Sequence, residues 1–333
     1  MTNPYKEASP PQKTDELIDL AFKRAFKRKH NVKGSDIIEI AREREIGRIR
    51  SMTDTVVSRL LSVVKSFPTV DNLHPFYREL AHVLVDVDRL RKSLAAAQWA
   101  AQTINRISKM YIRRIARSDD PDVMAKLRKE FTGRFSSILK QVSENIDYLA
   151  DSVNTLRKLP DIDTNLPTVV LAGMPNTGKS TIIRRLSSAE PEVAPYPFTT
   201  KGLIVGHNEL PGVGRVQFVD TPGLLDRPLA KRNWIERQAI LALKYLGHLI
   251  VYVFDPTETC GYTVKSQLSL YREIREEFNV PVVRVANKSD IRDLFHMKLS
   301  KIKEEVGDVI EISAELGKGV EELRKAIWKE LRK

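Results

Sequence analysis

Two hydrophobic patterns divide this chain. Before about residue 160, apolar side chains recur every three or four positions, which is typical of amphipathic helices. These stripes predict helices over 14–29, 36–67, 76–117 and 123–156. Stripes of this length indicate a helical bundle or a long antiparallel hairpin. We therefore predict an all-helical domain over 14–159, preceded by a polar segment, 1–13, that we expect to be disordered.

After a proline-containing linker, 160–167, short apolar runs alternate with helical patterns. The runs that predict strands are 169–172, 203–207, 216–219, 249–254, 280–286 and 309–312. The helical patterns are 235–246, 265–278, 295–306 and 320–332. This alternation predicts an α/β domain over 168–333, with a mainly parallel six-stranded sheet flanked by helices. Ligands of such sheets bind beyond the carboxyl ends of the strands.

Charge adds a difference between the two halves. The formal net charge of the 333 residues is +12. Residues 1–160 hold 30 lysines and arginines against 20 acids, whereas residues 161–333 hold 25 against 23. An excess of positive charge confined to the helical half indicates a polyanionic partner, most simply nucleic acid.

Several classes of protein are disfavoured by composition. The longest strongly apolar run, 249–254, is far too short to span a membrane, so we expect no membrane partner. The polar start lacks a secretory signal, and the lone cysteine, Cys260, excludes an internal disulfide. We therefore expect a cytoplasmic location. The scattered histidines lack zinc-ligand spacing beside Cys260.

The stretch from Gly173 to Ser180 fits the phosphate-binding pattern GxxxxGK[ST], between a predicted strand and a predicted helix. Backbone N–H groups in such a loop point at phosphate oxygens, and the helix end adds positive charge. Lys179 is expected to reach the terminal phosphates, and the Ser180 hydroxyl to bind Mg²⁺. The predicted nucleotide contacts of this loop are Asn176, Thr177, Gly178, Lys179, Ser180 and Thr181.

Two further stretches predict magnesium and third-phosphate contacts. Asp220 begins the string Asp-Thr-Pro-Gly after a predicted strand, and we expect it to hold Mg²⁺ through water. The Gly223 N–H is expected to sense the terminal phosphate. Between the phosphate loop and Asp220 lies Phe-Thr-Thr-Lys, in which we expect Thr200, with Thr199 as the alternative, to close over Mg²⁺.

The string Asn287-Lys288-Ser289-Asp290 follows another predicted strand. The Asp290 carboxylate can accept hydrogen bonds from guanine N1–H and the exocyclic amine, which adenine does not present in that arrangement. The Lys288 stem is expected to cover the base, and Asn287 to brace the loops. Backbone N–H groups of Ser313, Ala314 and Glu315 are suited to guanine O6.

On these motifs, residues 168–333 resemble a GTPase domain of the Obg family. Three stretches, 195–201, 219–226 and 256–261, are similar to the nucleolar GTP-binding protein (NOG) branch, and the length is similar to its short archaeal-type members. This resemblance implies GTP hydrolysis and a role in assembling the large ribosomal subunit, with ribosomal RNA as the basic domain's partner. Eukaryotic members continue with a long tail, so the resemblance implies nothing about functions tied to that tail.

Two residues modify the expected chemistry. Leu224 stands where Ras-like GTPases place a water-orienting glutamine, so we expect slow intrinsic hydrolysis and a catalytic group supplied from elsewhere. Asn176 has two interpretations. In some GTPases an asparagine here accompanies a bound potassium ion; alternatively, it braces the loop.

The predicted first helix has a basic face, and its RNA-contact candidates are Lys23, Arg24, Lys27 and Arg28. Arginines at 42, 44, 48 and 50, and at 113, 114 and 117, extend this prediction to the later helices. An ordinary solvated face is the alternative. For the whole protein, the predicted function is a GTP switch that binds pre-ribosomal RNA, with no DNA partner. The alternative is a GTP-regulated scaffold that binds a protein without RNA.

Overall fold

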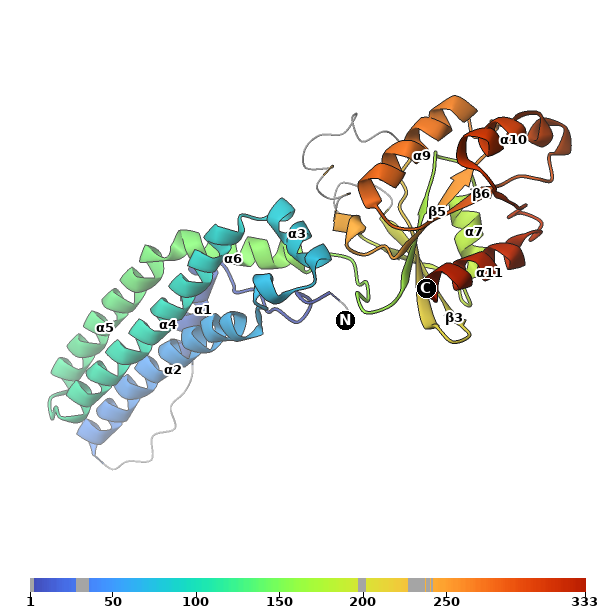
Figure 1. Ribbon diagram of the computed structural model, residues 1–333. Helices are drawn as coiled ribbons and strands as arrows, with labels where there is room; N and C mark the ends of the chain where they lie inside the picture. Colours follow the sequence, from blue (N-terminus) through green and yellow to red (C-terminus); the bar gives the residue numbers. More distant parts are fainter. Residues whose placement is uncertain (1–2, 28–35, 197–201, 227–236, 238–239, 241) are drawn as a thin grey trace. The chain divides into compact units, whose positions relative to one another are not determined.

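The computed structural model describes residues 3–333 except 28–35, 197–201, 227–236, 238–239 and 241 (Figure 1). It forms two compact units. One unit comprises Tyr5–Val70 and Leu84–Arg157. The other comprises Met1–Pro4, Asp71–Val83 and Lys158–Lys333.

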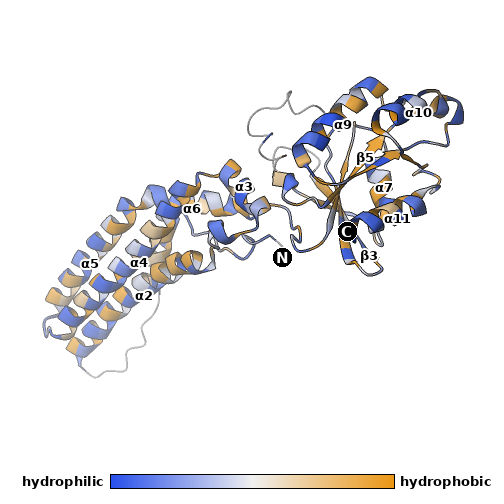
Figure 2. Cartoon of the chain, viewed as in Figure 1, coloured by the Kyte–Doolittle hydropathy of each residue, from blue (hydrophilic) through white to orange (hydrophobic). Residues whose placement is uncertain are grey.

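The first unit is a bundle of helices that bury their apolar stripes against one another. Its helices are α1 (Thr14–Lys27), α2 (Ile37–Ser66), α4 (Val87–Ala116), α5 (Pro121–Gln141) and α6 (Ser143–Leu156). Helix α4 packs against α2, α5 and α6, and α2 also packs against α1. Helices α2, α4, α5 and α6 each carry hydrophobic and hydrophilic positions, as the colours of Figure 2 show. Aspartates 36, 86 and 120 cap α2, α4 and α5, because their carboxylates accept first-turn N–H groups.

Two predicted helices are broken in the structure. The predicted helix 76–117 is divided into α3 (Pro75–Leu84) and α4, and Asp86 caps the second piece. The predicted helix 123–156 is divided at Val142, where φ is −108° and ψ is 11°. Gly133, although glycine weakens a helix, lies inside α5 and does not interrupt it. Periodicity did not reveal these breaks because the helices on both sides of each break have buried apolar residues at helical spacing.

The expectation that residues 1–13 are disordered is wrong for the part that the structure describes. Tyr5 is fully buried with its ring 5.6 Å from that of Phe67, and Ala8 is also buried. Asn3 donates from its side chain to the Leu159 carbonyl. The prolines of this segment suggested a loose chain, but burial of an aromatic side chain stabilises the packed form by roughly 2 kcal/mol.

Helix α3 and the preceding 3₁₀ turn η1 (Val70–Asn72) fall largely in the second unit, which the predicted boundary at 160–167 did not anticipate. The buried Tyr77 hydroxyl lies 3.0 Å from the Pro160 carbonyl and 2.9 Å from that of Ile162. The Phe76 ring stacks on Tyr196 at 6.4 Å. Segment 71–83 therefore packs with the α/β unit, although its sequence is helical.

The second unit contains a seven-stranded sheet, one strand more than predicted. Its strands are β1 (Thr168–Ala172), β2 (Glu192–Ala194), β3 (Leu203–Leu210), β4 (Gly214–Asp220), β5 (Leu249–Phe254), β6 (Val282–Ala286) and β7 (Ile310–Glu311). The order is β2-β3-β4-β1-β5-β6-β7. The β2–β3 and β3–β4 pairs are antiparallel, and the others are parallel. The missed strand, β2, is a largely exposed edge strand, so it has no buried apolar run.

Helices cover this sheet and direct its loops. Those with described bounds are α7 (Lys179–Leu186), α9 (Val264–Phe278), α10 (Arg292–Val306) and α11 (Val320–Leu331). Apolar residues of α7 and α11 join β1, β4 and β5 in one core. On β5, Tyr252 and Phe254 instead contact Tyr271 of α9. Among the described residues, no helix is long and apolar enough to cross a bilayer.

Candidate functional site

The loop between β1 and α7 can form only with glycine at two positions. Gly173 has a φ of 141°, and a Cβ there would lie 2.5 Å from the Val253 carbonyl oxygen. Gly178 has a φ of 97°, and a Cβ there would lie 2.2 Å from Asn287 Nδ2. The backbone therefore folds tightly around a concave surface, as a phosphate-binding loop requires.

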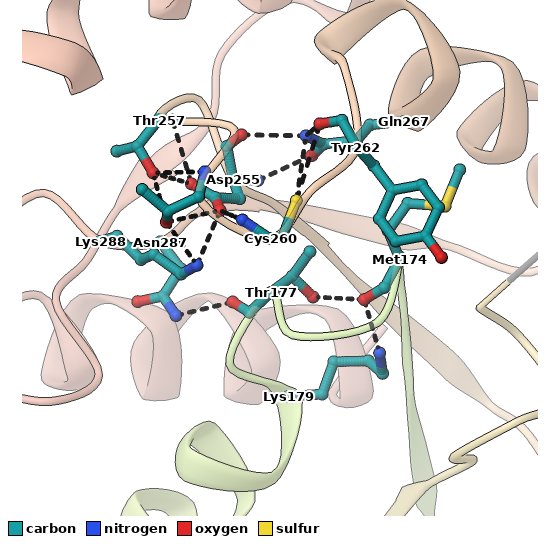
Figure 3. A network of polar contacts seen from close by, with 11 residues as sticks. Met174, Thr177, Lys179, Asp255, Thr257, Cys260, Tyr262, Gln267, Asn287 and Lys288 are labelled. Carbon is teal, nitrogen blue, oxygen red and sulfur yellow. Dashed lines mark hydrogen bonds and ion pairs between the residues drawn. The ribbon is translucent and has the colours of Figure 1, made fainter.

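Lys179 is placed at the floor of this loop. Its side chain is almost fully buried, and Nζ donates to the carbonyl oxygens of Gly173 (2.8 Å) and Met174 (2.9 Å; Figure 3). Burial lowers the Lys179 pKa, although nearby Asp220 acts in the opposite direction. A buried ammonium group held only by neutral carbonyls favours the arrival of an anion.

The residues predicted to hold magnesium fit that ion. Ser180 Oγ donates to Asp220 Oδ2 at 2.7 Å, and Asp220 is 1% exposed. Burial raises the Asp220 pKa. Asp220 Oδ1 is buried without a hydrogen-bond partner in the described part of the chain. A hydroxyl and a carboxylate side by side, with one oxygen unsatisfied, suit a hard cation. The predicted Thr200 and its alternative Thr199 lie outside the described residues.

No group of three or more acidic, histidine or cysteine side chains that could hold a metal occurs among the described residues. That result is compatible with Mg²⁺, which usually keeps several waters and binds substrate phosphates with one or two protein ligands.

The Gly223 N–H is already engaged in this structure. It donates to Asp226 Oδ2 at 2.8 Å, and Asp226 also lines the cleft. The sequence analysis did not identify Asp226. It could have been found as a carboxylate three residues after Gly223, whose N–H was predicted to contact the terminal phosphate. Leu224 is fully buried, so its side chain does not reach a water in the cleft.

Asn287 braces two loops, as predicted. Its Nδ2 donates to the Thr177 carbonyl at 2.8 Å, and its Oδ1 accepts from the Ala314 N–H at 2.9 Å. The Thr177 hydroxyl donates to the Met174 carbonyl at 3.0 Å, so Thr177 is turned inward rather than into the cleft. A single amide thereby fixes the phosphate loop relative to the loop after β7.

Two of the three backbone N–H groups predicted for guanine O6 have hydrogen-bond partners within the protein. The Ser313 N–H donates to Lys318 O at 3.0 Å, and the Ala314 N–H is used by Asn287. The Glu315 N–H is the remaining one of the three predicted groups, and Glu315 lines the cleft. Ser313 acts through its side chain instead, because Oγ donates to Asp290 Oδ1 at 2.5 Å. Backbone pairing of this kind is not visible in a sequence string.

A buried network holds Lys288 (Figure 3). Lys288 Nζ donates to Asp255 Oδ2 at 2.7 Å and to Thr259 Oγ1 at 2.8 Å. Asp255 is fully buried and also accepts from the Thr257 hydroxyl (2.5 Å) and the Cys260 N–H (2.8 Å). Burial raises the Asp255 pKa, but hydrogen bonds from Lys288 and Thr257 outweigh it and lower the pKa overall. The ammonium is therefore anchored while its alkyl stem lines the cleft.

Gln267 of α9 also belongs to this network. Its Oε1 accepts from the Asp255 N–H at 2.8 Å, and its Nε2 donates to the carbonyls of Asp255 (2.9 Å) and Tyr262 (3.0 Å). Sequence analysis missed Asp255 as a support of Lys288. The available signal was an aspartate directly after β5, beside the strand that carries the phosphate loop.

These side chains line one cleft of about 640 Å³ at the carboxyl edge of the sheet. That volume suits a small-molecule ligand. The predicted residues that line it are Asn176, Gly178, Lys179, Ser180, Thr181, Asp220, Gly223, Asn287, Lys288, Asp290 and Ala314. Thr177 and Ser313 do not line the cleft; they contact Asn287 and Asp290, which do.

The basic candidates on α1 are only partly placed. Lys23, Arg24 and Lys27 are exposed and line a hollow that also contains Asp54, whereas Arg28 lies outside the described residues. None of the three is seen in an ion pair within the described part of the chain.

The extension to the arginines of α2 is weakened by the structure. Buried Glu45 accepts from Arg44 (3.1 Å), Arg48 (2.9 Å) and Arg128 (2.5 Å), so these charges are used inside the bundle. Phe26 of α1 is 47% exposed, and the guanidinium of Arg48 lies over its ring.

Comparison with known proteins places both units in one family. A family model for the NOG1 N-terminal helical domain matches residues 6–163, and a model for nucleolar GTP-binding protein 1 matches residues 234–290. An uncharacterized protein of Methanocaldococcus jannaschii is 41% identical over 87% of this chain and 82% of its own length.

Nucleolar GTP-binding protein 1 of Saccharomyces cerevisiae is 31% identical over 96% of this chain, and that of Encephalitozoon cuniculi is 34% identical over 86%. The alignments cover 51% and 54% of those relatives, so the chain spans about half of their length. A crystal structure of a putative nucleolar GTP-binding protein 1 from Plasmodium falciparum aligns with 52% of this chain and 90% of its own, at 32% identity and a TM-score of 0.45. This chain therefore belongs to the nucleolar GTP-binding protein 1 family, with a helical N-terminal domain followed by a P-loop GTPase fold.

Proposed function

We propose that this protein binds and hydrolyses GTP as a switch in assembly of the large ribosomal subunit, with its helical bundle contacting ribosomal RNA. The observation that carries the proposal is the cleft itself. It holds a guanine-selecting carboxylate, Asp290, at one end and the phosphate-binding Lys179 and Ser180 at the other. The relatives named as nucleolar GTP-binding proteins support the ribosomal part of the proposal.

Each side chain has a defined task in this proposal. Lys179 gives up a carbonyl partner and pairs with phosphate oxygens. Ser180 and Asp220 hold Mg²⁺, which supplies positive charge at the phosphate oxygens where charge develops. Because Leu224 is buried, the residue that orients the attacking water comes from another element or from a partner. Intrinsic hydrolysis is therefore slow.

A potassium ion beside Asn176 is a further element of the proposal. Asn176 lines the cleft with a φ of 60°, and no described residue hydrogen-bonds to its side chain. The left-handed backbone alone explains an asparagine there, because asparagine tolerates this conformation. Equal hydrolysis rates in potassium and sodium buffers would leave only that structural role.

The test of the proposal is co-sedimentation of the full chain with large ribosomal subunits in GTP and in GDP, combined with phosphate release. We expect association that differs between the two nucleotides and weakens as salt rises. Nucleotide-dependent binding to a protein, indifferent to ribonuclease, would favour a GTP-regulated scaffold instead. Absence of phosphate release under all conditions would remove the enzymatic part.

A further inference from the structure

Beyond its first turn, where Asp88 lies, helix α4 carries positive charge and no acid. From Arg89 to Ser118 the sequence contains eight lysines or arginines and no aspartate or glutamate. By contrast, α2 interleaves both signs, with Glu39, Glu43 and Asp54 among its arginines. An ordinary solvated helix carries both signs, so α4 calls for another explanation.

Four of these cations form a line. Arg106, Lys109, Arg113 and Arg117 are spaced by three or four residues, which places them on one helix face, and all four are exposed. At a rise of about 1.5 Å per residue, the line is roughly 16 Å long. Together with Gln102 and Asn105 it borders a hollow of about 620 Å³.

The acids nearest in sequence are committed elsewhere. Asp119 pairs with Arg42 at 2.8 Å, and Asp120 caps α5. Glu130 of α5 lies 3.8 Å from Arg114, which is next to the line and not part of it. Within the described ranges, none of the four aligned cations is found in an ion pair, so no acid described in the structure compensates their charge.

We propose that this face of α4 binds the phosphate backbone of structured RNA. The inference rests on the proposed function and specifies which surface meets the RNA. A fixed line of cations matches a line of phosphates, and the guanidinium groups can bind phosphate oxygens in a bidentate manner. The amides of Gln102 and Asn105 are suited to ribose 2′-hydroxyls at one end of the line. Contacts of this kind position the protein without reading sequence.

The α4 face is a better candidate for RNA binding than the α1 face that the sequence favoured. Lys23, Arg24 and Lys27 share their hollow with Asp54, whose carboxylate offsets part of their charge. The α4 hollow has no acid in its lining. Binding of this face to an acidic protein surface is the other outcome that the experiment below distinguishes.

The experiment measures affinity of the full chain for a fluorescein-labelled 24-base-pair RNA duplex by anisotropy, over a series of potassium chloride concentrations. The variant replaces Arg106, Lys109, Arg113 and Arg117 with glutamine. Each phosphate contact contributes about 0.9 to the slope of log affinity against log salt in duplexes, so we expect the loss of four contacts to make the slope shallower by about 3.6. At low salt the affinity should fall at least tenfold.

A matched control removes the same charge from the α/β unit by replacing the exposed Lys265, Arg275, Lys301 and Lys325 with glutamine. It should bind the duplex like the wild type. GDP affinity and circular dichroism confirm that both variants are folded. A second variant, with glutamine at Lys23, Arg24 and Lys27, tests the α1 face in parallel.

If the α4 variant binds the duplex with the affinity and salt slope of the wild type, the inference is overturned. If only the α1 variant loses affinity for the duplex, the proposed function stands, but the RNA binds the α1 face instead. A wild-type protein that binds no RNA would remove the RNA part of the proposed function as well. If the α4 variant binds the duplex normally but no longer sediments with ribosomal subunits, this face binds a protein and the inference fails.

Discussion

The two ends of the nucleotide cleft differ in how much of their geometry the protein itself supplies. At the base end, Asp290, Lys288 and Asn287 are each held by hydrogen bonds to other parts of the chain. At the phosphate end, one Asp220 oxygen lacks a partner among the described residues, and the Gly223 N–H is occupied by Asp226. The base end is therefore organised before ligand arrives, whereas the phosphate end depends on ligand to satisfy its groups.

Selectivity and switching therefore arise at different ends of the cleft. A prearranged base end binds GTP and GDP equally, because both present the same guanine. A phosphate end with unsatisfied or exchangeable groups distinguishes them, because only GTP brings the third phosphate.

The largest effect is expected from Asp290→Asn. The asparagine side chain would place an N–H donor against the guanine amine, which is also a donor. The preference for guanosine diphosphate over xanthosine diphosphate should therefore fall by roughly 10³-fold or more. Xanthine presents an acceptor at that position, so xanthosine diphosphate should bind the variant well. Isothermal titration with both nucleotides checks the exchange. Unchanged guanosine affinity would show that Asp290 does not contact the base.

A smaller effect is expected from Asp255→Asn. Losing the charge that anchors Lys288 should weaken GTP and GDP alike by about tenfold, as expected for a charge-assisted hydrogen bond worth about 1.5 kcal/mol. Glu258→Gln is the matched control, because Glu258 pairs with Lys298 in the same loop region without touching Lys288. A change in the GTP-to-GDP ratio, measured by nucleotide competition, would contradict the view that this end is indifferent to the third phosphate.

At the phosphate end, Asp226→Ala should act on GTP alone. Its carboxylate competes with the third phosphate for the Gly223 N–H, so its removal should raise GTP affinity relative to GDP by about fivefold, equivalent to about 1 kcal/mol. Stopped-flow measurements with labelled GTP and GDP give this ratio. Equal gains for both nucleotides would indicate relief of general charge repulsion instead.

The smallest effect concerns pH. Hydrogen bonds hold the Asp255 pKa below its usual range, so its contribution is present above the ordinary aspartate pKa and is lost only as pH falls through the lowered value. The Asp255–Lys288 pair should therefore survive acidification from pH 7.5 to 5.5. The affinity ratio of wild type to Asp255→Asn should stay constant across that range; a ratio that shrinks toward one would show the carboxylate titrating there.

The sequence predicted most of what depends on local strings. The phosphate loop, Asp220 and Asn287 stand at strand ends, and parallel pairing of β1, β4, β5 and β6 brings those ends to one edge. Features that depend on distant partners were not predictable. The role of Asp255 requires Lys288, 33 positions away, and the Ser313 N–H is used by a pairing with Lys318.

The helical half shows the same limit. Its apolar stripes predicted the bundle. They did not predict that segment 71–83 packs with the α/β unit, because an amphipathic face does not reveal which core it covers. Nor could the sequence separate Arg48, used by Glu45, from Arg113, which has no ion pair in the described ranges.

The placement of α3 has a mechanical consequence. The chain passes from one unit to the other at residues 4–5, 70–71, 83–84 and 157–158, so four covalent connections join them. Phe76, inside the segment between two of these crossings, stacks on Tyr196, which directly precedes the stretch that contains Thr200. Any displacement of Tyr196 on nucleotide exchange would therefore pull on a tether anchored in the bundle at both ends, and a GTPase half expressed from residue 168 onward would lose that tether altogether.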